Sequence, residues 1–288
     1  MRRGPGWLFA ACLAAASAAC GGADDPGTAL ERLRDTGVVR IGYANEAPYA
    51  YRDTATGRVT GEAPEIARVV FERMGIETVE GVLTEFGSLI PGLQAGRFDV
   101  IAAGMYVTPE RCTQVAFSQP TYGVGEGFIV REGNPLNLHR YRDVRETPEA
   151  TLGVVSGAIE SQYARAVGIP DDRVITFPDS LAALAGVRAG RVSAYAATAL
   201  TVQNLLSKDS TGVEQALPFQ DPVVDGVTVK GYGALAVRQA DQALLAEIDR
   251  QLAGLIGTPG HLDLVAPFGF TVMQLPGTVT TAELCRPG

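Results

Sequence analysis

The chain has 288 residues, which is enough for one large or two medium-sized domains. Hydrophobic residues make up 46% of it, so the chain can bury real cores, and this composition excludes a disordered protein. The net charge is −8 and no basic stretch occurs, which argues against nucleic acid as a partner. The two histidines lie far apart and Cys-x-x-Cys is absent, so we expect no metal site.

The N-terminus predicts an export signal over residues 1–19. Two arginines precede an uncharged, Ala-rich run from Trp7 to Ala19, which is too short for a stable membrane span. Small residues then precede Cys20, as in a bacterial lipoprotein cleavage box, and a Gly-rich segment follows. We therefore expect lipidation at Cys20 and a tether over residues 20–30, outside the cytoplasm. Ordinary secretion without a lipid is the alternative.

An extracytoplasmic location bears on the remaining cysteines. Cys12 would leave with the signal and Cys20 would carry the lipid, so Cys112 and Cys285 remain. In an oxidising compartment two cysteines can form a disulfide. Two unpaired, buried thiols are the alternative.

Strand-like and helix-like patterns alternate in the first part of the chain after the tether. Apolar periodicity and turn residues predict three strands, at 38–44, 77–82 and 98–103, and two helices, at 64–74 and 88–95. This order is βαβαβ, the unit of a parallel sheet with helices on both of its faces.

The pattern then restarts and predicts a second α/β lobe. Its strands are expected at 127–131, 151–155, 173–177 and 191–196, and its helices at 159–167, 180–189 and 198–207. A strand at 232–238 repeats the Val-Arg ending of 127–131, so these two strands predict two crossings of one hinge. Asp241 is then expected to cap a long amphipathic helix that returns to the first lobe.

The sequence therefore predicts an α/β protein of two lobes, a clamshell of two doubly wound sheets joined by two hinge crossings. The first lobe would comprise 31–126 and 236–288, and the second would comprise 127–235. We expect the lobes to close around a ligand.

Aromatic and acidic residues follow the strands of the first lobe. Ligands of open α/β sheets bind beyond the carboxyl ends of the strands. Glu46 and Tyr49 follow the first strand, Phe86 follows the second and Tyr106 follows the third. Aromatic residues are only 7% of the chain, so three at one edge favour a binding site over core packing.

The stretch from Asp99 to Arg111 is the most informative part of the sequence. A buried strand ends in Gly104, and Tyr106, a threonine and Arg111 follow within a few residues. An arginine fork binds a carboxylate through two parallel hydrogen bonds, and an aromatic face can hold a cation. This combination predicts a site for a small zwitterion, although a single arginine is more often a surface residue.

The second lobe offers a turn at Gly157 and Ala158 that leads into a helix. Free N–H groups at such a turn could bind an anion, while a plain strand-to-helix connection is the alternative. The sequence contains no Gly-x-Ser-x-Gly, no phosphate-binding loop, no His-Glu-x-x-His and no histidine-centred dyad. Only Glu46 is a candidate acid or base, so we expect neither an enzyme nor a cofactor.

At these residues the chain resembles the periplasmic solute-binding proteins of ABC importers, in the polar amino-acid-binding family. The motifs that carry the resemblance lie at 41–49, 61–65, 89–99, 108–111 and 117–120, and the similarity runs from about 30 to 270. It implies a type II periplasmic-binding-protein fold, a small zwitterionic ligand, permease subunits in the membrane as partners, and a monomer.

Within that family the chain most resembles the ectoine- and hydroxyectoine-binding proteins. The resemblance implies that Tyr49, Phe86 and Tyr106 enclose a delocalised cation, which Glu46 balances. It also implies that Arg111, together with the turn at Gly157 and Ala158, holds the carboxylate of the ligand.

Two positions depart from the amino-acid binders of the family. Those proteins carry threonines at the second-lobe turn, where this chain has Gly157-Ala158-Ile159. They also carry an aspartate for the α-ammonium group, where this chain has Thr198. The second change favours a ring cation between aromatic faces. A binder of polar or cationic amino acids, a small-molecule lyase and a sensor module are the alternatives.

Overall fold

The structure is a computed structural model that describes residue 1, residues 28–224 and residues 226–287. The predicted export signal and Cys20 therefore lie outside the described residues, as does most of the predicted tether. The tether ends earlier than residue 30, because helix α1 (Ala29–Thr36) begins at Ala29. Thr28 caps this helix, and the side chains of Thr28 and Glu31 bond each other's backbone N–H groups in a capping box.

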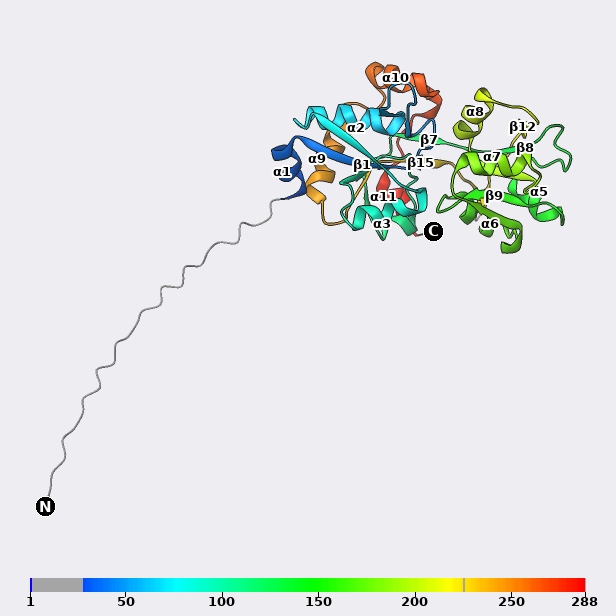
Figure 1. The fold of residues 1–288 in the computed structure, drawn as a ribbon, viewed down its shortest axis with the longest axis horizontal. Helices are drawn as coiled ribbons and strands as arrows, with labels where there is room; N and C mark the ends of the chain where they lie inside the picture. The colour runs from blue at the N-terminus through cyan, green and yellow to red at the C-terminus, as the bar shows by residue number, and fades with distance from the viewer. Residues whose placement is uncertain (2–27, 225, 288) are drawn as a thin grey trace.

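Two α/β lobes lie side by side, with strands β7 and β15 between them (Figure 1). The sheet of the first lobe has the order β4-β1-β5-β16-β6. Its strands are β1 (Val38–Tyr43), β4 (Thr78–Leu83), β5 (Val100–Ile101), β6 (Ala116–Phe117) and β16 (Ala236–Val237). Strand β1 pairs in parallel with β4 and β5, which confirms the predicted βαβαβ unit, whereas β16 pairs antiparallel with β5 and β6.

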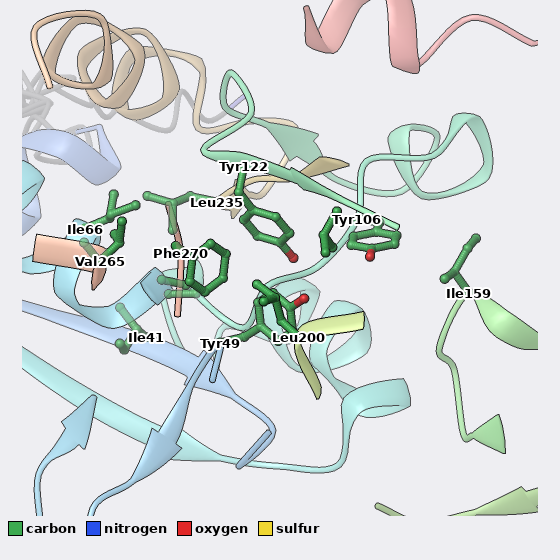
Figure 2. Close-up of a cluster of buried hydrophobic side chains, with 14 of the residues drawn as sticks. Ile41, Tyr49, Ile66, Tyr106, Tyr122, Ile159, Leu200, Leu235, Val265 and Phe270 are labelled. Atoms are coloured by element: carbon green, nitrogen blue, oxygen red, sulfur yellow. The ribbon is translucent and has the colours of Figure 1, made fainter. Parts of the chain in front are cut away.

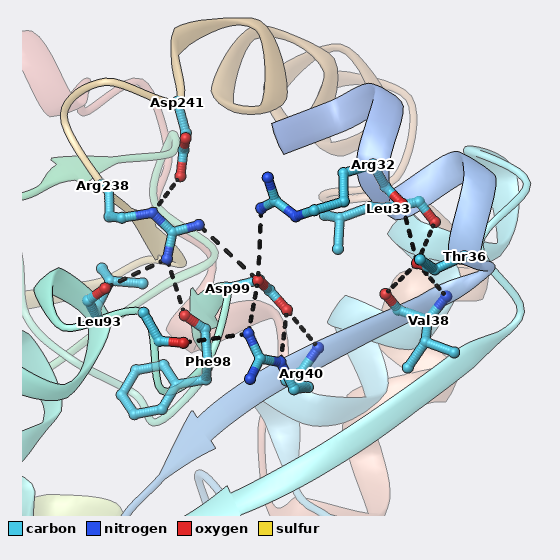
Figure 3. Close-up of polar contacts among 11 residues, drawn as sticks. Arg32, Leu33, Thr36, Val38, Arg40, Leu93, Phe98, Asp99, Arg238 and Asp241 are labelled. Carbon is cyan, nitrogen blue, oxygen red and sulfur yellow. Dashed lines mark hydrogen bonds and ion pairs between the residues drawn. The ribbon is translucent and has the colours of Figure 1, made fainter. Parts of the chain in front are cut away.

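The third predicted strand, 98–103, is shorter than expected. Asp99 lies just before β5 and is buried, with its carboxylate among three arginines (Figure 3). The backbone N–H and Nε of Arg40 both donate to Asp99 Oδ2, at 3.0 and 3.2 Å, and Arg32 and Arg238 lie within 3.9 Å of Oδ1. This cluster ties the start of β5 to α1, to β1 and to the segment after β16, so the role of Asp99 in its motif is structural.

The sheet of the second lobe has the order β10-β9-β11-β8-β12. Its strands are β8 (Glu126–Arg131), β9 (Leu152–Val155), β10 (Val174–Phe177), β11 (Ala194–Thr198) and β12 (Val213–Gln215). Strands β9, β10 and β11 are parallel, but β8 pairs antiparallel with β11 and β12. Both sheets are thus mixed. Strand β16 in the first sheet and strand β8 in the second belong to the connections between the lobes, and each runs antiparallel to its neighbours.

Helices cover the two sheets, which confirms the predicted α/β class. In the first lobe they are α1, α2 (Glu62–Arg73), α3 (Leu89–Gln94), α4 (Pro109–Cys112), α9 (Gln242–Ala253), α10 (Pro259–Val265) and α11 (Thr281–Leu284). In the second lobe they are α5 (Tyr141–Glu146), α6 (Glu160–Val167), α7 (Ser180–Arg188) and α8 (Ala199–Lys208). None of the helices in the described ranges is long and apolar enough to cross a membrane.

The prediction that the side chain of Asp241 caps helix α9 is wrong. Asp241 occupies the N-cap position, but its side chain makes no capping hydrogen bond within the described residues. Its carboxylate instead forms an ion pair with Arg238, with Oδ2 2.8 Å from Nε. Arg238 also donates to the carbonyls of Leu93 and Phe98, so Asp241 helps to hold an arginine that joins two parts of the first lobe.

The lobes are connected by an antiparallel pair of short strands, β7 (Tyr122–Val124) and β15 (Gly231–Gly233). Strand β7 precedes the predicted strand 127–131, which is β8, whereas the predicted strand 232–238 is divided between β15 and β16. Gly231 is required there, because a Cβ atom at this residue would lie 1.8 Å from the ring of Tyr106. The hinge is therefore packed directly against a predicted site residue.

Cys112 and Cys285 form a disulfide in the structure, with their Cα atoms 5.7 Å apart. Cys112 ends α4, immediately after Arg111, and Cys285 follows α11 near the end of the described chain. The bond fastens the short helix that carries Arg111 to the C-terminal segment of the first lobe.

Candidate ligand-binding site between the lobes

A cavity lies between the two lobes, with about 400 Å³ of atom-free space, including the part that opens to solvent. Its first-lobe wall consists of Glu46, Tyr49, Phe86, Gly104, Tyr106 and Arg111. Its second-lobe wall consists of Val155, Ala158, Ile159, Glu160, Tyr195 and Thr198. Of the eight residues predicted to bind the ligand, all but Gly157 line this cavity, which brings together side chains from both lobes.

The ring of Tyr49 is fixed by a second layer of aromatic residues. Its centroid lies 5.1 Å from that of Tyr122 and 5.6 Å from that of Phe270, and the latter two are 5.3 Å apart (Figure 2). The hydroxyl of Tyr122 donates to the carbonyl of Gly104 at 2.7 Å. Tyr122 and Phe270 do not line the cavity, but they hold the aromatic wall in place.

Tyr106 is buried between the cavity and the hinge. Its ring packs on Gly231, and its hydroxyl oxygen is buried without a hydrogen-bond partner among the described residues. Burial raises the pKa values of Tyr106 and Tyr49 well above the usual value, so both stay neutral phenols. These residues therefore offer π faces, and no negative charge, to a ligand.

Arg111 is held in one orientation on the cavity wall. Thr108 caps α4 by accepting from the backbone N–H of Arg111, and the guanidinium donates to the carbonyls of Tyr106 and Gly157, both at 2.9 Å. Its Cζ atom lies 5.6 Å from the ring centroid of Phe86. Two of five N–H donors are thus used, and the others remain for a ligand anion. Phe86 lines the cavity and also stacks with Arg111.

The structure shows which groups of the turn at Gly157 and Ala158 are engaged, while the predicted anion-binding role of the turn stays a prediction. The N–H of Ala158 donates to the carbonyl of Val155 at 3.1 Å, so it is not free to bind an anion. Gly157 instead presents its carbonyl to Arg111 of the other lobe. A Cβ atom at Gly157 would lie 2.5 Å from Cα of Gly87, and its φ is +76°, so only glycine permits this contact. The turn therefore joins the lobes.

A chain of hydroxyl groups also joins the lobes, and we call it the hydroxyl chain. Tyr49 donates to Thr198 Oγ1 at 2.8 Å, and Thr198 donates to Thr201 Oγ1 at 3.1 Å. Thr201 in turn donates to Glu46 Oε1 at 2.8 Å. Thr198 also caps α8 by accepting from the N–H of Thr201. The hydroxyl of Thr198 is therefore engaged within the protein and bonds the first lobe.

Glu160 is an acidic cavity residue that sequence reasoning missed. It is the first residue of α6 and only 5% exposed. Burial, with a smaller effect from Glu46, raises its pKa to about 8, although Arg111 opposes the shift. Burial also raises the pKa of Glu46. An acid in the first turn of a helix is usually exposed, so only the adjacent Gly157 turn could have drawn attention to Glu160.

The cavity thus combines one fixed cation, neutral aromatic faces and two carboxylates. Such a lining can hold a small molecule that carries both a carboxylate and a cation. Within residues 28–224 and 226–287, no group of three or more His, Cys, Asp or Glu side chains could hold a metal ion.

Comparison with known proteins places this geometry in a transport family. A probable amino-acid ABC transporter periplasmic-binding protein of Sinorhizobium fredii, y4tE, is 39% identical over 261 residues, covering 89% of this chain and 85% of the relative. An L-arginine-binding protein of Pseudomonas aeruginosa is 28% identical over 224 residues, covering 75% and 82% of the two chains.

A solved structure of EhuB in complex with hydroxyectoine superposes with a TM-score of 0.82 at 36% identity. The similarity covers 90% of this chain and 98% of that one. This match confirms the predicted two-lobed periplasmic-binding-protein fold of type II.

The model of the bacterial extracellular solute-binding proteins, family 3, matches residues 39–260. Its members, like the relatives above, are transport solute-binding proteins and not enzymes. The protein therefore works outside the cytoplasm as the solute-binding component of an amino-acid-type ABC importer, and the chain belongs to the bacterial extracellular solute-binding proteins, family 3.

Proposed function

We propose that this solute-binding protein captures ectoine, hydroxyectoine or a similar small cyclic zwitterion. The observation that carries the proposal is the presence of Arg111, a carboxylate at Glu46 and the rings of Tyr49, Phe86 and Tyr106 on one cavity. The hydroxyectoine complex of EhuB supports it, since that protein is 36% identical over most of this chain.

Separate groups on the first-lobe wall would recognise the two charges of the ligand. The free N–H donors of Arg111 would bind the carboxylate as a fork. The rings of Tyr49 and Tyr106 would face the delocalised cation, and Glu46 would balance its charge. Because lobe closure excludes water, both interactions act in a medium of low dielectric constant and become stronger than in solution.

The division of the chain into two moving units is part of the proposal. Residues 31–126 and 236–288 would form one unit and residues 127–235 the other, turning about β7 and β15. The contacts of Arg111 with Gly157 and the hydroxyl chain support this motion, since both would break on opening.

A binder of a cationic amino acid is the second candidate. The arginine-binding relative and the additional carboxylate of Glu160 favour it. Against it stands the engaged hydroxyl of Thr198, since an α-ammonium group would lack a free carboxylate at this position.

Anchoring and partners complete the proposal. Lipid attachment at Cys20 would keep the protein at the membrane, where monomers would deliver the ligand to ABC permease subunits. The small residues before Cys20 support the anchor. Metabolic labelling with a fatty acid should mark the wild-type protein and not Cys20→Ala.

Calorimetric titration tests the ligand. The purified mature protein would be titrated with ectoine, hydroxyectoine, arginine, glutamine and glycine betaine. We expect tight binding of ectoine or hydroxyectoine and weak or absent binding of the others. Tight binding of a standard amino acid without any response to ectoine would contradict the proposal and favour the second candidate.

A further inference from the structure

Two carboxylates of the cavity come from opposite lobes. Glu46 lies in the turn after β1 of the first lobe, and Glu160 begins α6 of the second lobe. The hydroxyl of Thr201 occupies one oxygen of Glu46. The carboxylate of Glu160 bonds its own backbone N–H, and no other described residue donates to it. Glu160 is thus a buried, weakly partnered acid that faces the ligand space.

The charges around Glu160 are predominantly negative. Glu46 faces it from the turn after β1, and Glu126 faces it from β8. Arg111 is the only basic side chain among the described residues that line the cavity. Neutral tyrosines also lie near Glu160, namely Tyr163 on the same helix, Tyr141 on α5 and Tyr195 on β11. Carboxylates at such a site cannot all be ionised unless a further cation arrives.

On the basis of the proposed function, we infer that Glu46 and Glu160 form a carboxylate clamp, one on each side of a delocalised cation. The cation bears N–H groups on both sides. Its binding releases a proton from the clamp. The ligand class is an amidinium, either in a ring or in a guanidinium group. A quaternary ammonium has no N–H to donate, so it would leave buried carboxylate oxygens unsatisfied.

We expect one proton to leave the protein when the ligand cation binds. In the closed arrangement of the lobes, before a ligand cation arrives, Glu160 carries a proton at neutral pH, since burial raises its pKa to about 8. The ligand enters with its cation already protonated, and its charge stabilises the ionised carboxylate. The proton of Glu160 then leaves to the buffer, and no bond of the ligand is made or broken. Affinity should therefore rise with pH between about 6 and 8 and level off above this range.

Titration of the whole mature protein with ectoine in two buffers tests the clamp. Phosphate and Tris at the same pH differ in their heat of protonation, so a released proton changes the observed binding enthalpy. We expect release of up to one proton at pH 7 and almost none at pH 9.5. Glycine betaine, as the quaternary probe, should bind at least about tenfold more weakly than ectoine.

Glu160→Gln keeps the shape of the side chain and removes its titration. We expect this variant to lose the buffer dependence and to bind ectoine about tenfold more weakly. Glu85→Gln is the matched control, because Glu85 lies next to Phe86 on the same rim but is exposed and outside the cavity. It should keep both the affinity and the proton release of the wild type.

The outcomes separate the clamp from the proposed function. If wild-type protein binds ectoine without a buffer dependence, or if Glu160→Gln binds ectoine as tightly as the wild type, the clamp is wrong and the proposed function stands. Equal affinity for glycine betaine would also overturn the clamp. If no zwitterion binds, both ideas fail. The buffer comparison uses only wild-type protein, so it remains decisive even if Glu160→Gln does not fold.

Discussion

The two walls of the cavity are built differently. The first-lobe wall carries aromatic rings and Arg111, and a second layer of Tyr122 and Phe270 fixes its geometry. The second-lobe wall carries three aliphatic residues beside Glu160, Tyr195 and Thr198. Thr198, and the carbonyl of Gly157 next to the wall, bond the opposite lobe. On the proposed function, the first lobe would recognise most of the ligand, while the second lobe would mainly close over it and add Glu160.

Removal of Arg111 should have the largest effect on binding. Arg111→Ala deletes the buried cation for the ligand carboxylate and also the contact with Gly157, so we expect a loss of affinity of about a hundredfold or more by calorimetry. Arg111→Lys keeps the charge but not the fork, and it should recover only part of the affinity. Arg97→Ala, an exposed arginine of the same lobe, is the control. Normal binding by Arg111→Ala would mean that the site is misplaced.

Substituting alanine for one side chain on each wall of the cavity compares the two lobes directly. Tyr106→Ala removes a buried ring of the first lobe, and we expect affinity to fall at least about tenfold more than for Ile159→Ala of the second lobe. Tyr106→Phe should bind almost normally, because the hydroxyl has no partner among the described residues. An equal or larger effect of Ile159→Ala would reverse the assignment of recognition to the first lobe.

The hydroxyl chain should contribute less, and only through closure. Thr198→Val removes hydrogen bonds to Tyr49 and Thr201 while keeping the shape of the side chain, so we expect a three- to tenfold loss of affinity, equivalent to about 1 kcal/mol. Small-angle scattering of the ligand-free variant should show a more open molecule than the wild type. Unchanged scattering together with unchanged affinity would mean that the hydroxyl chain does not contribute to lobe closure.

A buried acid of the first lobe should affect stability and not affinity. Burial raises the pKa of Glu62 to about 8, against 4.5 for the ordinary group, while Thr121 donates to one of its oxygens. The folded protein then holds a proton that the unfolded chain releases near pH 4.5, so stability should fall as pH rises from 4.5 to 8. Glu62→Gln should reduce this fall by a few kcal/mol, which is several degrees in Tm.

Thermal unfolding from pH 5 to pH 8 measures this effect, with Glu72→Gln, an exposed acid of the same helix, as the control. If Glu62→Gln lowers Tm equally at every pH, the carboxyl acts through its hydrogen bond with Thr121 alone and its titration does not matter.

Much of the fold could be predicted from local patterns. Strands such as β1 and β9 and helices such as α2 and α7 follow apolar periodicity closed by turn residues, and these predictions are confirmed. The antiparallel entry of β8 and β16, and the pairing of β7 with β15, depend on contacts between distant segments. Periodicity carries no information about such pairings.

Part of the candidate site could be predicted because several of its residues directly follow strands. Glu46, Phe86 and Tyr106 follow strand ends, and strand ends of one sheet meet at one edge, so their order in the sequence reports their place. Glu160 and Tyr195 lie within a helix and a strand, where an acid and an aromatic residue look ordinary. The N–H of Ala158 was assigned to an anion because its bond to Val155 depends on the shape of the turn.

A crystal structure of the mature protein grown with ectoine tests the central claim most directly. We expect the ligand to lie between the lobes, with its carboxylate in hydrogen-bond range of Arg111 and its ring against Tyr49 and Tyr106. A ligand carboxylate that contacts only the second lobe, or a ring that lies away from the first-lobe aromatic wall, would contradict it.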